Sequence, residues 1–234
     1  MKKAIKYCQV VALCLVVVGC SKSIKDSGHK GVQLWKDGPY WAETNVGAEK
    51  PWEFGYYFWW GDTVGYKREG DAWVASNGSS SNYKFDELST LTYSKDLVTL
   101  YREGWTGKDG ILLPEHDAAH VHWGGKWRMP TERELEDLRR ECDWTWGTMN
   151  GVNGYVVRGR GDYATASIFL PAAGCGIGTF FDYANSRGYY WSSVPYLHYS
   201  VNSCLLYLCS DYSETNRSFR RCGESIRPVQ GSAK

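Results

Sequence analysis

The stretch "WGGKWRMPTERELEDL", residues 123 to 138, contains the clearest helix signal in the chain. Thr131 stands before a helical pattern and Glu134 follows three residues later, which is the spacing of a capping box at a helix start. Leu135 and Leu138 then lie on one face of the expected helix. The sequence therefore predicts an amphipathic helix that packs its leucine face against the rest of the domain.

The residues before this helix have the character of a scaffold. Gly124 and Gly125 allow a tight turn, and Pro130 ends a short strand before the helix begins. We expect Arg128 and Arg227 to make internal charge-assisted hydrogen bonds, while a ligand role stays open for both. Tryptophan has a large side chain with one polar edge, which suits a position in such a scaffold. Three tryptophans are predicted to be buried anchors: Trp123, Trp127 and Trp191.

Outside this stretch the chain consists mainly of short strand-like pieces separated by Gly, Asn and Ser. A second short helix is predicted within residues 114 to 123, with Ala118, Ala119 and Val121 facing inward. Residues 64 to 110 are polar and irregular, and no repeat of 20 to 50 residues is present. Two short helices in a strand-rich chain predict an α+β fold.

The first residues are typical of an export signal. Residues 1 to 19 combine a lysine-rich start with an apolar run about half as long as the ~20 residues that a membrane span needs. They end in Val-Val-Gly before Cys20, which looks like a lipobox, so Cys20 is expected to be acylated; an ordinary secretory signal with a chance cysteine is the alternative. We predict a tether over residues 20 to 30 and one domain over residues 31 to 230.

The net charge limits the kinds of partner, and the number of cysteines limits the possible disulfides. Removing residues 1 to 19 deletes three lysines and no acid, so the net charge falls from +1 to −2. Neither value suggests a nucleic-acid or an anionic-lipid partner. Five cysteines remain after Cys20, an odd number that allows at most two disulfides whose connectivity is open. They are Cys142, Cys175, Cys204, Cys209 and Cys222.

Several segments together resemble the major paralogous domain (FISUMP) family of secreted lipoproteins. They include "LWKDGPYWAETNVGAEKPWEFGYYFWWGDT" (34–63), "WRMPTERELEDL" (127–138), "IFLPAAG" (168–174), "GYYWSS" (188–193) and "SIRPV" (225–229). The resemblance implies a C-type-lectin-like domain in which short helices pack on small twisted antiparallel sheets. It also implies a lipoprotein at the bacterial outer membrane, exposed to the exterior. Most members have no assigned activity, so the fold name alone does not give a function.

Residues 194 to 222 have an unusual composition. Only Glu214 among these 29 residues is Lys, Gln, Glu, Trp or Met, whereas these types make up 36 of the 174 residues from 20 to 193, a proportion that predicts about six. Codons that end in a pyrimidine cannot encode these five types. Some C-type-lectin-like proteins are diversified at such codons by retroelements, so we expect a variable ligand-binding face here.

The expected face follows from strand alternation in "CLLYLCS", residues 204 to 210. Leu206 and Leu208 would fill the core, while Leu205, Tyr207 and Cys209 point the other way. Tyr, Asn and Arg provide rigid aromatic contact and adaptable hydrogen bonds. The partner is expected to be a protein or glycan outside the cell. The predicted face comprises Tyr196, His198, Tyr199, Asn202, Tyr207, Asp211, Tyr212, Asn216, Arg217 and Arg221.

Other interpretations of the same residues stay open. Cys204 and Cys209 have the C-x4-C spacing of the copper ligands in formylglycine-generating enzymes, but a strand would place them on opposite faces. His116, His120 and His122 are a weak zinc candidate. The Glu-Pro-Asn, Gln-Pro-Asp and Trp-Asn-Asp triplets of calcium-dependent sugar sites are absent. We expect no catalysis and no cofactor; a structural envelope lipoprotein without a ligand is the remaining alternative.

Overall fold

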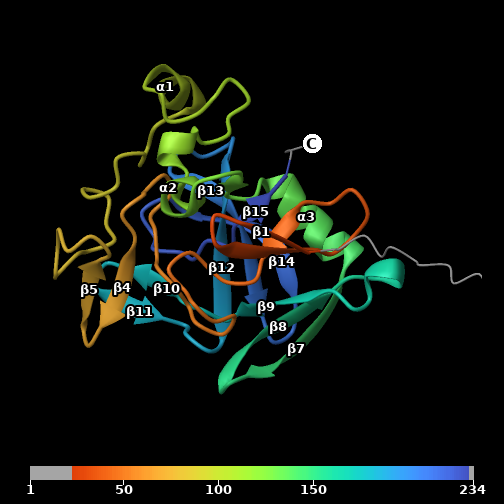
Figure 1. Ribbon diagram of the computed structural model, residues 1–234. Coiled ribbons are helices and arrows are strands. Elements are labelled where there is room, and N and C mark those ends of the chain that lie inside the picture. Colours follow the sequence, from red (N-terminus) through yellow and green to blue (C-terminus); the bar gives the residue numbers. More distant parts are fainter. Residues whose placement is uncertain (1–22, 232–234) are drawn as a thin grey trace, which may run out of the picture.

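The computed structural model describes residues 23 to 231 (Figure 1). Small antiparallel sheets dominate and helices are few, in agreement with the predicted α+β class. The predicted signal at residues 1 to 19 and the acylated Cys20 lie outside the described residues. The helices are α1 (Leu97–Arg102), α2 (Ala118–Trp123) and α3 (Glu132–Glu141), with short 3-10 helices η1 (Pro114–His116) and η2 (Gly161–Tyr163).

The strands of residues 23 to 231 form five sheets. The largest has the order β1 (Ser23–Asp26), β2 (His29–Gln33), β3 (Tyr40–Ala42), β15 (Val229–Gln230) and β6 (Trp127–Arg128). Two three-stranded sheets contain β7 (Asp143–Met149), β8 (Val152–Arg158) and β9 (Ser167–Pro171), and β12 (Arg187–Pro195), β13 (Asn202–Cys209) and β14 (Ser213–Phe219). Two hairpins pair β4 (Tyr66–Glu69) with β5 (Ala72–Ala75), and β10 (Cys175–Ile177) with β11 (Phe180–Asp182).

The predicted tether is wrong over residues 23 to 30. These residues form the hairpin of β1 and the start of β2, with Lys25 opposite Lys30. Its turn is Ser27-Gly28, and both residues have positive φ, 49° and 84°. A two-residue turn of this kind matches the twist of a hairpin, and a Ser-Gly pair is a turn signal that the sequence already contained.

Helix α3 begins as the sequence predicts. The Thr131 hydroxyl accepts a hydrogen bond from the Glu134 backbone N–H, and the Glu134 carboxylate accepts one from the Thr131 N–H, which completes the capping box. Leu135 and Leu138 are buried. The helix packs against β12, β13 and β14, as Figure 1 shows.

The β12–β13–β14 sheet has apolar side chains on both faces. Tyr190, Leu206 and Leu208 belong to the core that includes the leucines of α3. Trp191 and Leu205 belong to a second core on the opposite face. Leu205 points away from Leu206 and Leu208, as predicted, but it fills this second core and is only 1% exposed, so it cannot belong to a variable surface.

Two further expectations about helices need correction. A third helix, α1, is present where an irregular segment was expected, and the Asp96 carboxylate caps it by accepting a hydrogen bond from the Thr99 N–H at 2.8 Å. In α2, Ala118 and Ala119 are buried as predicted, but Val121 is 48% exposed. The inward face of this six-residue helix runs from the alanines to Trp123, so Val121 falls outside it.

The buried Arg227 confirms the scaffold role predicted for it. Its guanidinium donates to the Asn45 side chain and to the backbone carbonyls of Ala42, Glu43 and Phe169, at 2.9 to 3.0 Å. Burial lowers its pKa to about 10, so the group remains charged at neutral pH. These bonds join the closing segment of the chain to strands far away in the sequence. Trp123, Trp127 and Trp191 are also buried, as predicted.

Candidate functional site

The ten residues of the predicted face are all at least partly exposed. Tyr199 is 60% exposed and Tyr212 50% exposed, whereas Cys204, Leu206 and Leu208 of the same hairpin are buried. The hairpin therefore carries both core and surface side chains.

The structure does not bring the ten residues into one patch. Strand β13 has eight residues, so its ends lie roughly 23 Å apart at about 3.3 Å per residue. Asn216 lies opposite Leu205 and Arg217 opposite Cys204, so these two neighbours point to opposite faces of the sheet. The predicted residues instead belong to separate groups at the two ends of the hairpin.

One group is a row of four tyrosines. The ring centroids of Tyr183 and Tyr189 are 6.4 Å apart, those of Tyr189 and Tyr207 5.3 Å, and those of Tyr207 and Tyr212 5.7 Å. The Arg187 guanidinium lies over the Tyr183 ring, 4.2 Å from its centroid. Burial raises the pKa of Tyr207 to about 12, so its hydroxyl stays a hydrogen-bond donor at neutral pH. We call Tyr183, Tyr189, Tyr207 and Tyr212 the tyrosine row.

Half of the tyrosine row was not predicted from the sequence. Tyr189 comes together with Tyr207 only through the pairing of β12 with β13, in which the two residues are direct partners. Tyr183 follows β11 and has a positive φ of 62°, which is rare for an aromatic residue. A strained backbone that presents an exposed ring is a common feature of binding sites.

The second group lies in the connection between β12 and β13. The rings of Tyr196 and Tyr199 stack at 6.1 Å, and His198 is 5.4 Å from Tyr196. The Arg217 guanidinium lies 4.8 Å from the centroid of Tyr196. We call Tyr196, His198, Tyr199 and Arg217 the loop cluster. A small hollow of about 130 Å³ beside this connection is lined by residues that include Tyr101, Pro195 and Leu197.

The four remaining predicted residues have local partners. Asn216 donates to the Glu214 carboxylate at 2.6 Å, and Asp211 accepts from the Ser210 hydroxyl at 2.9 Å. The Asn202 carbonyl accepts from Tyr196 and Arg220. Arg221 forms an ion pair with Glu87 and stacks on Phe219.

The cysteine arrangement does not fit a two-thiolate copper site. Cys204 and Cys209 are five positions apart on β13 and therefore point to opposite faces of its sheet. Cys204 is buried, and burial raises the pKa of its thiol to about 12, which disfavours the thiolate that a metal needs. All five cysteines within residues 23 to 231 are free thiols.

The three histidines of the zinc candidate have separate partners. His116 packs on the Trp105 ring, His120 contacts the Trp127 carbonyl at 3.3 Å, and His122 contacts the Thr63 carbonyl at 3.0 Å. Among residues 23 to 231, no three His, Cys, Asp or Glu side chains are grouped so that they could hold a metal ion.

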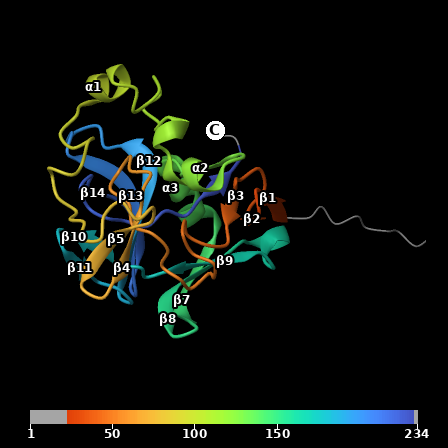
Figure 2. The same ribbon diagram turned by 60° about the vertical axis from the view of Figure 1, so that its left-hand side comes forward.

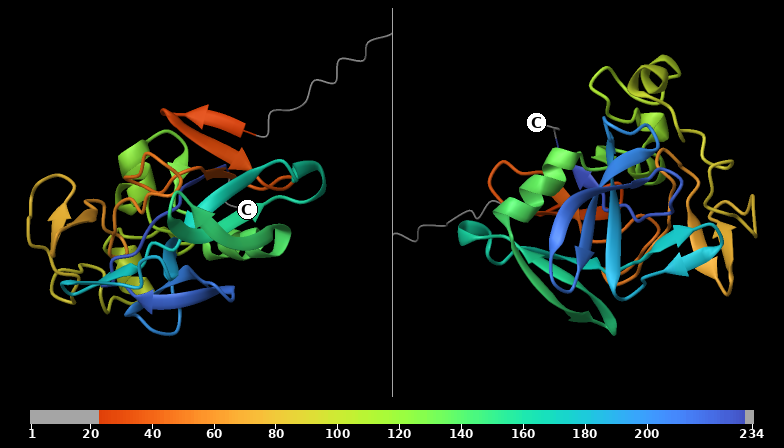
Figure 3. Two further views of the ribbon diagram at one scale, coloured as in Figure 1. Left: turned by 90° about the horizontal axis from the view of Figure 1, so that it is seen from below. Right: turned by 180° about the vertical axis from the view of Figure 1, so that it is seen from behind.

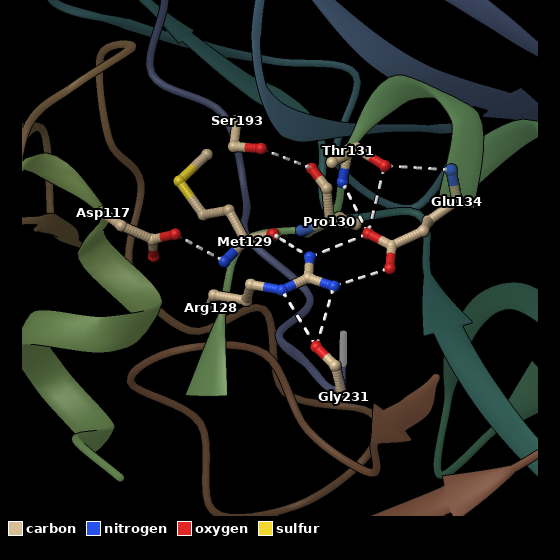
Figure 4. Close-up of polar contacts among 8 residues, drawn as sticks. All are labelled: Asp117, Arg128, Met129, Pro130, Thr131, Glu134, Ser193 and Gly231. Carbon is tan, nitrogen blue, oxygen red and sulfur yellow. Dashed lines mark hydrogen bonds and ion pairs between the residues drawn. The ribbon is translucent and has the colours of Figure 1, made fainter. Parts of the chain in front are cut away.

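The polar network around Arg128 is structural (Figure 4). All five N–H donors of Arg128 are used: by both Glu134 carboxylate oxygens at 2.6 and 2.8 Å, by the Met129 carbonyl, and twice by the Gly231 carbonyl. Asp117 accepts from the Met129 N–H at 2.8 Å, and burial raises the pKa of its carboxyl to about 6. With its donors occupied, Arg128 has none left for a ligand.

Comparison with protein-family models, with curated proteins and with solved structures gives no match. Of the helices in the described part of the chain, none is long and apolar enough to cross a membrane.

Proposed function

We propose that this chain is a lipid-anchored binding protein displayed on the bacterial cell envelope, with a C-type-lectin-like domain of the major paralogous domain (FISUMP) family. The family and fold rest on the order of the quoted segments, with the "WRMPTERELEDL" helix packed beside the sheet that carries "GYYWSS". The ligand is a protein or glycan outside the cell.

One observation supports the binding function most strongly. The hairpin of β13 and β14 places its leucines in the core and leaves the neighbouring tyrosines at the surface. Leu205, Leu206 and Leu208 are at most 1% exposed, while the tyrosines of the row and of the loop cluster stay partly exposed. Aromatic rings held by a packed sheet lose little entropy on binding and supply both apolar area and a hydroxyl. The two groups are therefore well suited to contact a partner.

The position of the hairpin agrees with display. Strand β1 and the β12–β13–β14 sheet lie on opposite sides of the domain in Figure 2 and in the left panel of Figure 3. Anchoring through Cys20, shortly before β1, would hold the β1 side near the membrane. The tyrosine row would then point away from it.

Retroelement diversification of residues 194 to 222 is the specific form of this proposal. The depletion of Lys, Gln, Glu, Trp and Met also extends over residues 150 to 190, which include the largely buried strand β9. Composition alone therefore does not define the variable segment. The test is the neighbouring DNA: a reverse transcriptase gene with an adenine-rich copy of codons 194 to 224 supports diversification, and its absence contradicts it.

Binding is tested with the full-length protein on an array of cell-surface glycans and proteins. The variants Tyr207→Ala/Tyr212→Ala and Tyr196→Ala/Tyr199→Ala remove one aromatic group each, and Leu91→Ala, at 61% exposure, is the control. We expect at least tenfold weaker binding in one tyrosine variant and no change in the control. An array without any bound probe favours a structural envelope lipoprotein instead. Binding that survives both variants refutes the two aromatic groups as the binding surface.

A further inference from the structure

The hairpin of β1 and β2 is fixed to the domain. The Trp127 indole N–H donates to the Asp26 carbonyl at 3.1 Å. The Asp26 carboxylate accepts from the Lys126 N–H at 3.2 Å and from the Gln230 amide at 2.6 Å. His29 stacks on Trp123 with the ring centroids 3.7 Å apart. Strand β1 therefore belongs to the rigid body and is not a swinging arm.

This rigidity limits the distance between the domain and a lipid at Cys20. Only Ser21 and Lys22 separate Cys20 from Ser23, the first residue of β1. Three residue steps span roughly 11 Å at full extension. Ser23 must then lie within about one and a half Debye lengths of the lipid headgroups, since the Debye length is about 8 Å at physiological salt.

The surface around β1 carries three exposed lysines, Lys25, Lys30 and Lys126, which we call the basic face. Lys25 and Lys30 are direct partners across the hairpin, an arrangement in which like charges repel. Lys25 and Lys126 line the same hollow of about 540 Å³, together with Gly125 and Asp26. An anion placed here would relieve the repulsion.

Two carboxylates, Asp26 and Glu43, offset part of the positive charge of the basic face. Asp26 is occupied by the Lys126 N–H and Gln230. Glu43 is 3.9 Å from the Lys30 ammonium, at the outer limit of an ion pair, and both groups are largely exposed. Exposed pairs of this kind contribute little. Lys22 adds a further positive charge two residues after Cys20.

We propose that the basic face is a membrane-docking surface that contacts the phosphate groups of anionic lipids. This inference rests on the acylation of Cys20 in the proposed function. Each lysine close to an anionic surface strengthens attachment about fivefold. Docking would fix the orientation of the domain, so that the β12–β13–β14 sheet on the opposite side faces outward (Figure 3).

The test is a lysine acetylation footprint of the native full-length protein, read by mass spectrometry. The protein is compared in detergent, on phosphatidylcholine vesicles, and on vesicles with 30% phosphatidylglycerol. We expect Lys25, Lys30 and Lys126 to react about fivefold more slowly on the anionic vesicles than in detergent. Lys67 and Lys108, which are exposed on other parts of the domain, should react equally in all three.

The outcomes separate the two proposals. A protein that floats with the vesicles but reacts equally at all five lysines refutes the docking surface and leaves the anchor intact. If the three lysines of the basic face react as slowly on phosphatidylcholine vesicles as on the anionic vesicles, the role of anionic lipid is refuted. A protein that does not float refutes acylation of Cys20, and the docking surface with it.

Discussion

Glu224 makes the stability of this domain depend on pH. Its side chain is 1% exposed, and its Oε2 atom has no hydrogen-bond partner within residues 23 to 231. Burial raises the pKa of this carboxyl from the ordinary 4.5 to about 8. The folded state therefore keeps a proton that the unfolded state releases once the pH exceeds 4.5.

The size of the effect follows from the difference in pKa. A difference of about 3.5 units corresponds to on the order of 5 kcal/mol, since one unit is about 1.4 kcal/mol. Because of Glu224, the free energy of unfolding should fall as the pH rises from about 4.5 to 8. Above pH 8 this carboxyl should contribute little further change. In Glu224→Gln the amide is neutral at every pH, so this part of the decline should disappear.

The assay is urea unfolding of the full-length protein and of Glu224→Gln at intervals from pH 4.5 to 9. Asp62 and Asp117 also have pKa values raised to about 6 by burial, so both proteins should lose some stability in this range. The difference between the two curves isolates Glu224. Curves that run parallel from pH 4.5 to 9 would refute the assignment of a protonated, buried carboxyl.

Three further perturbations test the scaffold and the copper alternative. Arg227→Met leaves the Asn45 side chain and three carbonyls without their donor and should cost about 3 kcal/mol or more in urea unfolding; a cost below about 1 kcal/mol contradicts the clamp. Thr131→Ala should cost about 1 kcal/mol in the same assay, and Thr131→Ser should restore most of it, whereas no rescue argues against the cap. Copper(I) titration of the native protein and of Cys204→Ser/Cys209→Ser should give the same curve, because the thiols lie on opposite faces of β13; two-thiol binding lost in the variant would restore the enzyme alternative.

The sequence predicts those parts of the structure that depend on near neighbours. The start of α3 is predictable because Thr131 and Glu134 satisfy each other within one turn. The leucine face of that helix follows from its period. The hairpin at residues 23 to 30 could have been found from Ser27-Gly28 between two short alternating segments.

The parts that depend on strand pairing could not be predicted. Tyr189 joins Tyr207 only because β12 lies beside β13 in a particular register, and Tyr183 contacts Tyr189 from the connection between β11 and β12. The same register places Leu205 against a second core, which alternation along a single strand cannot show. The ten residues of the predicted face are therefore at least partly exposed, but they do not form one patch.

In the proposed binding function, a packed scaffold fixes the backbone, so the tyrosines around β13 are free to vary. Urea unfolding of Tyr199→Ala/Tyr207→Ala/Tyr212→Ala beside Trp191→Ala tests this claim most directly. Tyr199 and Tyr212 are at least half-exposed and Tyr207 is only partly buried, so together they should cost about 2 kcal/mol or less, while the fully buried Trp191 should cost ~3–5 kcal/mol. A triple variant that unfolds, or that loses as much stability as Trp191→Ala, would contradict the claim.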